Sequence, residues 1–238
     1  MPDHRKHRGP HPEDAELFGT SALPALRQAA SEYCYLLDRG YPPVATLKLV
    51  GDRHRLRERQ RIALNRSTCS AAAAASRRAR EVALTDCRHL VIDGFNVVTT
   101  IEAALAGGVV IVGREGCYRD MASMHGSYRR VQETAPALES IGEQLQEAGV
   151  TQAEWLLDEP VSNSGRLAGV MRELAKSRGW PWSVRLVPDP DRELSARRDA
   201  AIASADREVL DAGDRWCNLA AAVVRATLRD AWVVAFNT

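Results

Sequence analysis

Residues 89–99 read His-Leu-Val-Ile-Asp-Gly-Phe-Asn-Val-Val-Thr, an apolar run that ends on an acid. A glycine follows Asp93 directly, and a helical pattern of apolar residues begins just beyond Asn96. The stretch therefore predicts a buried strand that turns into a helix, with Asp93 at the turn. In open α/β folds, the carboxyl edge of the sheet is where ligands and metal ions bind.

Two further apolar runs end on an acid, at Asp158 in Trp-Leu-Leu-Asp and at Asp206 in Ala-Ile-Ala-Ser-Ala-Asp. From residue 89 onward such runs alternate with helical patterns, which is typical of a parallel sheet flanked by helices. Segment 113–131 has no clear period and is expected to form a long loop. The expected strands are 89–93, 109–113, 153–158, 183–187 and 200–205, and the expected helices are 97–106, 134–148, 165–178, 190–198, 206–212 and 218–230.

Four parts follow along the chain. Residues 1–20 are polar and contain histidines and prolines, which predicts a disordered tail. Residues 21–80 repeat apolar side chains at helical spacing and are expected to form a small, basic, all-α domain. Residues 81–88 are interpreted as a linker to an α/β domain over residues 89–238.

Composition narrows the function classes. No apolar stretch approaches the roughly 20 residues of a membrane span, and the polar N-terminus does not resemble a secretory signal. The five cysteines are scattered without a paired Cys-x-x-Cys spacing, which argues against a zinc site and fits a reducing cytoplasm. Residues 1–88 carry a net charge of +6 and residues 89–238 one of −5. This distribution suits a chain whose N-terminal part binds a polyanion and whose C-terminal part binds cations.

The three strand-end aspartates are the candidate metal ligands. If their strands are neighbours, the carboxylates of Asp93, Asp158 and Asp206 converge and would repel one another unless a cation lies between them. Hard cations such as Mg²⁺ and Mn²⁺ take such oxygen ligands. Ser204 and Glu208 flank Asp206 as Ser-x-Asp-x-Glu and add a hydroxyl and a possible fourth carboxylate.

A plainer interpretation stays open for each acid. An aspartate at the end of a strand is also the ordinary N-cap of the following helix, and for any one of the three the two roles are about equally expected. Three such acids in one sheet favour the metal site.

Other polar residues are candidate substrate contacts. Ser162, Asn163 and Ser164 precede a clear helix and offer donors for a phosphate, although a plain capping segment is the slightly favoured explanation. Arg119 and Asp120 lie in the long irregular segment. Six arginines and one acid between residues 53 and 66 predict a helix that contacts nucleic acid, or one that is merely solvated, with Arg53, Arg57, Arg59 and Arg61 as the candidate contacts.

Several motifs resemble known families. The string Val-Ile-Asp-Gly-Phe-Asn-Val-Val resembles the first motif of the PIN/NYN superfamily of metal-dependent ribonucleases. The segments ending in Asp158 and containing Asp206 are similar to that superfamily's later acidic motifs. Over nearly its whole length, the chain also resembles an uncharacterised archaeal and bacterial family with a short helical N-terminal domain, through RGYP, LKLVGDR, HGSYR and PVSNSGRL.

The resemblance implies a three-layer PIN/NYN-like domain with a central, mainly parallel sheet, preceded by the small all-α domain. It implies a catalytic set of Asp93, Asp158 and Asp206 as ligands of Mg²⁺ or Mn²⁺, with Asn96 as a positioning residue.

We therefore expect a cytoplasmic metal-dependent nuclease that hydrolyses RNA phosphodiester bonds. A homodimer is one possible assembly. The alternative is a non-catalytic nucleic-acid- or nucleotide-binding module with a PIN-like fold. A phosphatase of the haloacid dehalogenase type is set aside, because Phe95 stands where that fold needs a second aspartate.

Overall fold

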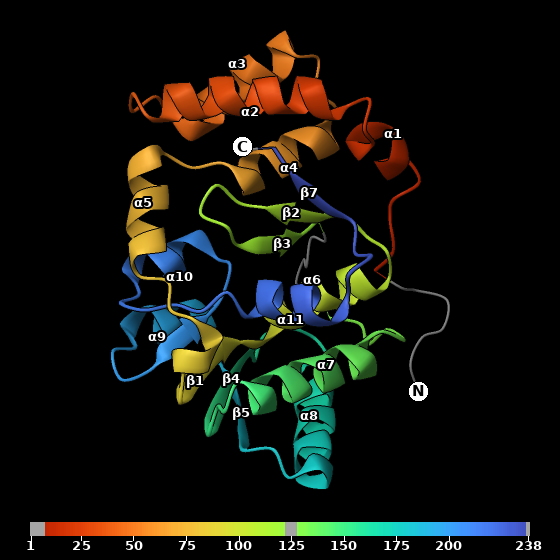
Figure 1. The fold of residues 1–238 in the computed structure, drawn as a ribbon, viewed down its shortest axis with the longest axis vertical. Coiled ribbons are helices and arrows are strands. Elements are labelled where there is room, and N and C mark those ends of the chain that lie inside the picture. The colour runs from red at the N-terminus through yellow and green to blue at the C-terminus, as the bar shows by residue number, and fades with distance from the viewer. Residues whose placement is uncertain (1–7, 122–127, 237–238) are drawn as a thin grey trace.

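The computed structural model describes residues 8–121 and 128–236. Its main sheet has four parallel strands in the order β5-β4-β1-β6 (Figure 1). The chain order reverses beside β1, because β4 pairs with one edge of β1 and β6 with the other. Crevices at such reversals are where open α/β sheets bind ligands. The strands are β1 (His89–Asp93), β4 (Gln152–Asp158), β5 (Trp182–Val187) and β6 (Ala201–Ala203).

Helices cover both faces of this sheet. Side chains alternate along β1, so that Leu90 and Ile92 join the core beneath one helical layer and Val91 joins the core beneath the other. The first layer contains α6 (Gly94–Leu105), α7 (Thr134–Glu147), α8 (Ser164–Arg178) and α11 (Leu219–Thr227), and the second contains α9 (Pro190–Ala196) and α10 (Arg207–Ala212). The expected mixed α/β architecture with a parallel central sheet is thus confirmed.

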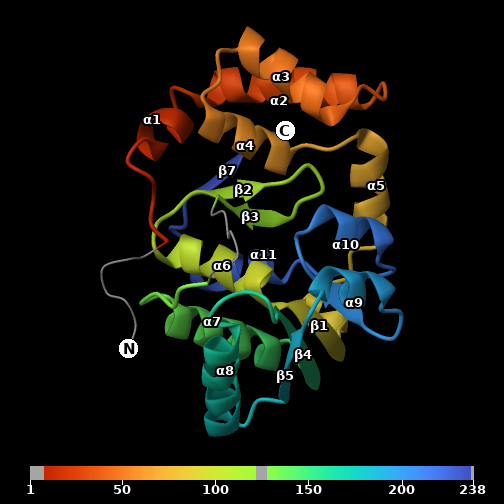
Figure 2. The same ribbon diagram turned by 180° about the vertical axis from the view of Figure 1, so that it is seen from behind.

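A second sheet lies between α6 and the N-terminal helices (Figures 1 and 2). It has the order β3-β2-β7, with β3 antiparallel and β7 parallel to β2. Its strands are β2 (Val110–Val112), β3 (Tyr118–Asp120) and β7 (Val233–Ala235). Its core is shared with α2 (Leu23–Leu37), α3 (Pro43–Arg53) and α4 (Glu58–Ser67), whereas α5 (Ala71–Ala79) packs against α10.

The helices expected over 21–80 are present, but they do not enclose a core of their own. Leu26, Tyr33 and Leu64 share one buried cluster with Ile111 of β2 and with Phe236, which directly follows β7. The helical segment is therefore built onto the α/β part. Within the linker expected at 81–88, a short 3₁₀ turn (Leu84–Asp86) forms, and Glu81 pairs with Trp216 as an isolated bridge.

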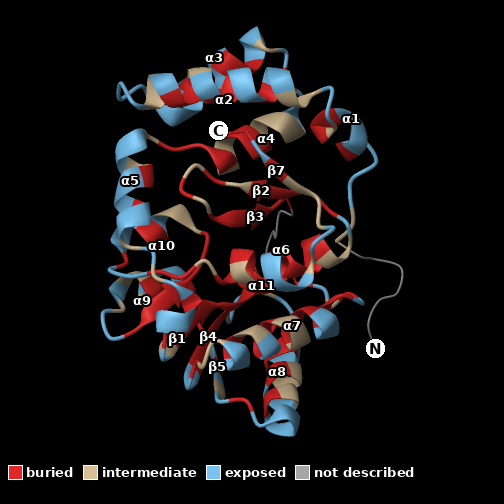
Figure 3. Ribbon diagram, in the orientation of Figure 1, coloured by how far each residue is buried: buried red, intermediate tan, exposed pale blue. Residues whose placement is uncertain are grey.

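Two sequence expectations about the second sheet are wrong. The strand expected at 109–113 forms as β2, but it lies outside the main sheet, and β3 and β7 were not expected at all. Each of the three strands has only three residues, too few to show a period of two. Their pairing depends on partners distant in the chain, and Figure 3 shows β2 and β3 coloured mainly as buried.

The expectation of a disordered tail over residues 1–20 is wrong for its described part. Helix α1 (Asp14–Phe18) forms there, with Leu17 and Phe18 buried in the cluster below α2 and α4. Arg8 forms an ion pair with the fully buried Glu102 of α6. The burial of Leu17 and Phe18 and the ion pair between Arg8 and Glu102 thus anchor a polar segment of the chain. Residues 1–7 lie outside the described chain.

No helix among the described residues is both long and apolar enough to cross a membrane.

Candidate functional site

A pocket of about 550 Å³ opens at the carboxyl edge of the main sheet. It lies where β1, β4 and β6 end. Residues of β3, from the second sheet, and of α4, from the helical layer above that sheet, also line it. The sequence predicted that strand-end acids would meet here, and the structure brings all of them to the pocket wall. Six carboxylates line it: Asp93, Asp120, Asp158, Asp191, Asp206 and Glu208.

Asp93 is the most buried of these acids, at 6% exposure. Its Oδ1 accepts a long bond from the backbone N–H of Asn96 at 3.4 Å, and its Oδ2 accepts from the hydroxyl of Ser204 at 2.7 Å. The following Gly94 is required by packing, because a Cβ there would come within 2.9 Å of the carbonyl oxygen of Leu156. The Asp-Gly pair therefore lets α6 start hard against β4.

Burial raises the pKa of the Asp93 carboxyl to about 7, although the hydrogen bond from Ser204 works in the opposite direction. The charges of Asp191 and Asp158 add to the rise. This carboxyl therefore shares an electrostatic environment with the acids that end β4 and follow β5.

Ser204 joins Asp93 to Asp206, the members of the predicted metal set that come from the neighbouring strands β1 and β6. Its hydroxyl donates to Asp93 and accepts from the backbone N–H of Asp206 at 3.0 Å. Asn96 strengthens the same junction, since its side-chain oxygen accepts from the N–H of Ala205 at 2.9 Å. Both residues position the carboxylates, and Asn96 also lines the pocket whereas Ser204 lies behind it.

Asp206 caps α10, as the plainer interpretation of the sequence allowed. Its Oδ1 accepts from the N–H groups of Glu208 at 2.8 Å and Val209 at 3.2 Å. A carboxylate offers about four lone-pair sites, so capping through one oxygen leaves the other for a ligand. Capping and ligand binding are thus compatible for this residue.

Asp191 is a pocket acid that the sequence analysis missed. Partial burial raises the pKa of Asp191 to about 6, followed by repulsion from Asp206 and Asp158. Burial likewise raises the pKa of Asp158. The signal was present: residues 183–187 form an apolar-rich run, and Pro-Asp-Pro-Asp follows it in the way that acids follow the other strands.

The carboxylates line one pocket without meeting at one point. Within residues 8–121 and 128–236, no three histidine, cysteine, aspartate or glutamate side chains are grouped closely enough to hold a metal ion. The expectation that Asp93, Asp158 and Asp206 already surround one cation is therefore not met by the side chains as they lie. Like charges without a counter-ion repel, and the cap of α10 holds Asp206 back. The donor set itself, oxygen from carboxylates and an amide, suits Mg²⁺ or Mn²⁺.

Three arginines form the basic part of the pocket lining: Arg66 of α4, Arg119 of β3 and Arg207 of α10. Arg119 donates to the carbonyl oxygens of Ala205 at 2.8 Å and Arg66 at 3.1 Å and forms an ion pair with Glu115. The predicted substrate residue Arg119 thus lines the pocket while all its nitrogens are engaged in the fold.

Asp120, the other candidate from the irregular segment, also lines the pocket. It accepts from the hydroxyls of Thr99 at 2.9 Å and Thr100 at 3.3 Å and pairs with Arg66. It therefore fixes α6 and α4 to β3 at the pocket rim.

The predicted phosphate seat at Ser162, Asn163 and Ser164 is not among the pocket-lining residues. The Asn163 amide donates to the carbonyl oxygen of Tyr128, and the Ser164 hydroxyl donates to that of Glu159. Asn163 thus fastens the start of α8 to the segment before α7, and Ser164 fastens it to the turn after β4. Neither side chain caps the helix.

The arginines expected to contact nucleic acid are each bound within the chain. Arg53 pairs with Glu32 and Arg57 with Glu13 and Glu16, while Arg59 pairs with the buried Asp14 and Arg61 with Asp52. None of the four lines the pocket. The arginine-rich segment thus attaches α4 to α1 and α3 through Arg59 and Arg61, and α3 to α2 through Arg53.

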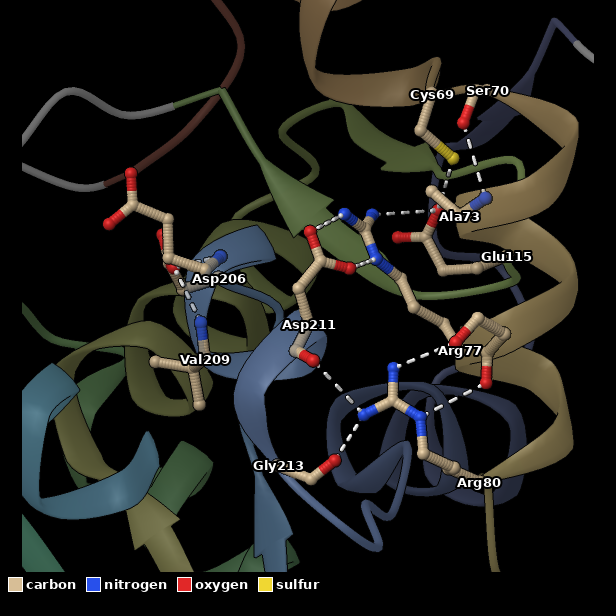
Figure 4. Close-up of polar contacts among 12 residues, drawn as sticks. Cys69, Ser70, Ala73, Arg77, Arg80, Glu115, Asp206, Val209, Asp211 and Gly213 are labelled. Carbon is tan, nitrogen blue, oxygen red and sulfur yellow. Dashed lines mark hydrogen bonds and ion pairs between the residues drawn. The ribbon is translucent and has the colours of Figure 1, made fainter. Parts of the chain in front are cut away.

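A buried ion network fixes α10, and with it the Asp206 end of the site, to α5. Arg77 lies between Asp211 and Glu115, with nitrogen–oxygen distances of 2.7 and 3.8 Å (Figure 4). Arg80 donates to the carbonyl oxygens of Asp211 and Gly213 at the end of the same helix. The helical layer therefore contributes to the geometry of the pocket.

The raised pKa values give a pH prediction for the metal-free protein. Between the pKa of an unfolded aspartate and about 7, native Asp93 holds a proton that the unfolded chain has released. The free energy of unfolding should therefore fall as pH rises from 4 to 7, by up to about 1.4 kcal/mol per pH unit from this group. Urea unfolding in EDTA measures the slope; Asp93→Asn should flatten it, and an equal slope in the variant would contradict the assignment.

Two family models match the chain. Residues 83–222 match the model described as Domain of unknown function (DUF5616), and residues 25–80 match Protein of unknown function (DUF434). An uncharacterised protein of Methanocaldococcus jannaschii is 27% identical over 188 residues, which cover 78% of this chain and 89% of that protein. No solved structure matches the chain.

Proposed function

This chain belongs to the family described as Domain of unknown function (DUF5616), and we propose that it is a metal-dependent nuclease that hydrolyses RNA. The observation that carries the proposal is the delivery of Asp93, Asp158 and Asp206 by three adjacent parallel strands into one pocket. A PIN/NYN-like fold is part of the same proposal, supported by the Asp-Gly-Phe-Asn turn and the Ser-x-Asp-x-Glu segment at this edge.

The charge state of the pocket supports cation binding. Asp93, Asp158 and Asp191 all have raised pKa values, and mutual repulsion contributes to the rise at Asp93 and Asp191. Asp93, Asp158 and Asp206 would hold the ion, with Asp191 and Glu208 at the margin. A bound Mg²⁺ or Mn²⁺ would neutralise this repulsion, activate water and stabilise charge on a phosphodiester.

The chain's own residues supply the arrangement around the ion. Ser204 holds the carboxylate of Asp93 at the end of β1 and the backbone of Asp206 at the start of α10. Asn96 fixes the same turn through Ala205. Between pH 6 and 8 Asp93 is poised to exchange a proton, because burial raises its pKa to about 7.

A non-catalytic nucleic-acid- or nucleotide-binding module is the second candidate. It is favoured by one observation: the described side chains contain no ready-made group of three metal ligands. In that case the pocket would bind an anionic ligand through its arginines and would not cut it.

Metal removal separates the two candidates. Full-length protein incubated with labelled single-stranded RNA should cleave it in Mn²⁺, stop in EDTA and resume when Mn²⁺ is restored. RNA binding without cleavage in any divalent cation would support the module instead. Cleavage that persists in EDTA would exclude this pocket as a metal-dependent centre.

A further inference from the structure

Arg207 stands out among the guanidinium groups around the pocket. It is the first residue of α10, next to Asp206, and it lines the pocket together with Asn65 and Arg66 of the helical layer. Its Nη2 is buried and has no hydrogen-bond partner within the described chain. Buried guanidinium groups are rarely left in this condition, since an unmatched donor costs free energy.

The neighbouring arginines have acidic partners, although Nη1 of Arg77 is likewise buried without a hydrogen-bond partner within the described chain. Arg77 pairs with Asp211 and Glu115, and Arg119 pairs with Glu115 and two carbonyl oxygens. Glu115 thus already serves two cations. Arg207 forms no ion pair among the residues that the structure describes. The cluster of Arg77, Arg119, Arg207 and Glu115 therefore contains more positive than negative charge.

This excess is electrostatically unfavourable. The positive charges of Arg119 and Arg77 act on the guanidinium of Arg207, and the charge of Glu115 opposes them. An anion placed against the guanidinium would supply both the missing acceptor and the missing charge.

We propose that Arg207 is the centre of a phosphate-binding subsite in the basic part of the pocket lining, with Asn65 and Arg66 beside it. Phosphate is the anion favoured here because a guanidinium offers two parallel donors that match two phosphate oxygens.

The subsite deepens the proposed function, on which it rests for its biological ligand, by naming the residue that would hold a phosphate of the RNA. Two sources share this chemistry: an internal phosphodiester next to the one that is cut, and a terminal phosphate of an oligonucleotide.

Inorganic phosphate tests the subsite without any cleavage. In Tris buffer with EDTA, calorimetric titration should detect phosphate binding to the full chain, and Arg207→Gln should weaken it by at least about tenfold. Arg207→Lys should retain part of the affinity. Arg198→Gln, which removes an exposed arginine paired with Asp214, should bind as the unaltered protein does.

Thermal unfolding distinguishes a binding role from a structural one. Without phosphate, Arg207→Gln should melt at the same temperature as the unaltered protein or above it, because an unpaired buried charge is lost. Phosphate should raise the melting temperature of the unaltered protein and leave that of the variant unchanged. A lower melting temperature of the variant in phosphate-free buffer would mean that Arg207 serves the fold.

Oligonucleotides identify the source of the phosphate. If it is terminal, a 5′-phosphorylated RNA should bind more tightly than its 5′-hydroxyl form, and Arg207→Gln should abolish the difference. If it is internal, both forms should weaken equally in the variant.

The subsite is overturned if the unaltered protein binds no phosphate, or if Arg207→Gln binds it within about twofold of the unaltered protein. Because all these measurements are made in EDTA, absence of nuclease activity leaves a positive result standing, and cleavage without phosphate binding contradicts the subsite alone.

Discussion

Asp93→Asn is expected to lower the rate of metal-dependent RNA cleavage by at least about 100-fold, since even residues that only support a metal ligand typically contribute 10- to 100-fold. The substitution removes the carboxylate charge at the end of β1 and keeps nearly the same shape. Ser204 can accept from the new amide while still accepting from the N–H of Asp206, so the turn should remain intact.

The same substitution should stabilise the metal-free protein at pH 8. There the native chain holds Asp93 ionised although burial raises its pKa to about 7, and an amide carries no such cost. Loss of activity with a gain in stability is the pattern of a residue kept for function. A residue kept for the fold would show the reverse.

Single-turnover cleavage of labelled RNA in Mn²⁺ and urea unfolding in EDTA at pH 8 provide the two measurements. Asp214→Asn is the matched control, because this acid is exposed, pairs with Arg198 and does not line the pocket. Cleavage by Asp93→Asn at the unaltered rate would assign the activity to a contaminant or to another site.

Arg77→Met is expected to lower the free energy of unfolding by about 3–5 kcal/mol, more than any other substitution considered for this chain. Arg77 is buried, and its guanidinium lies between Glu115, also buried, and Asp211. Methionine fills much of the same space but leaves the second positive partner of Glu115 absent. Arg119 alone would then face that carboxylate.

Asp211→Asn is the control for this prediction, because the side chain of Asp211 is 53% exposed and water can replace its lost interaction. Its effect should stay near 1 kcal/mol or below. Denaturant unfolding of both variants gives the comparison. Similar losses in the two would show that the pair with Asp211, and not the buried charge of Glu115, carries the stability.

Much of the sheet edge could be predicted from the chain alone. An apolar run followed by an acid is a local pattern, and it located Asp93, Asp158 and Asp206 at strand ends. Parallel strands point the same way, so acids at their carboxyl ends share one edge. The short β3 and β7 carried no such pattern, and Asp191 was overlooked although its run of residues is similar.

The sequence by itself determined the alternation of strands and helices and the placement of acids at one edge, because both follow from side-chain periodicity over a few consecutive residues. Only the tertiary structure decided which charges are neutralised. It paired Arg53, Arg57, Arg59 and Arg61 with acids elsewhere in the N-terminal part and left Nη2 of Arg207 buried at the pocket without a hydrogen-bond partner. The balance of a charge depends on neighbours that are distant in the chain, and no local pattern records them.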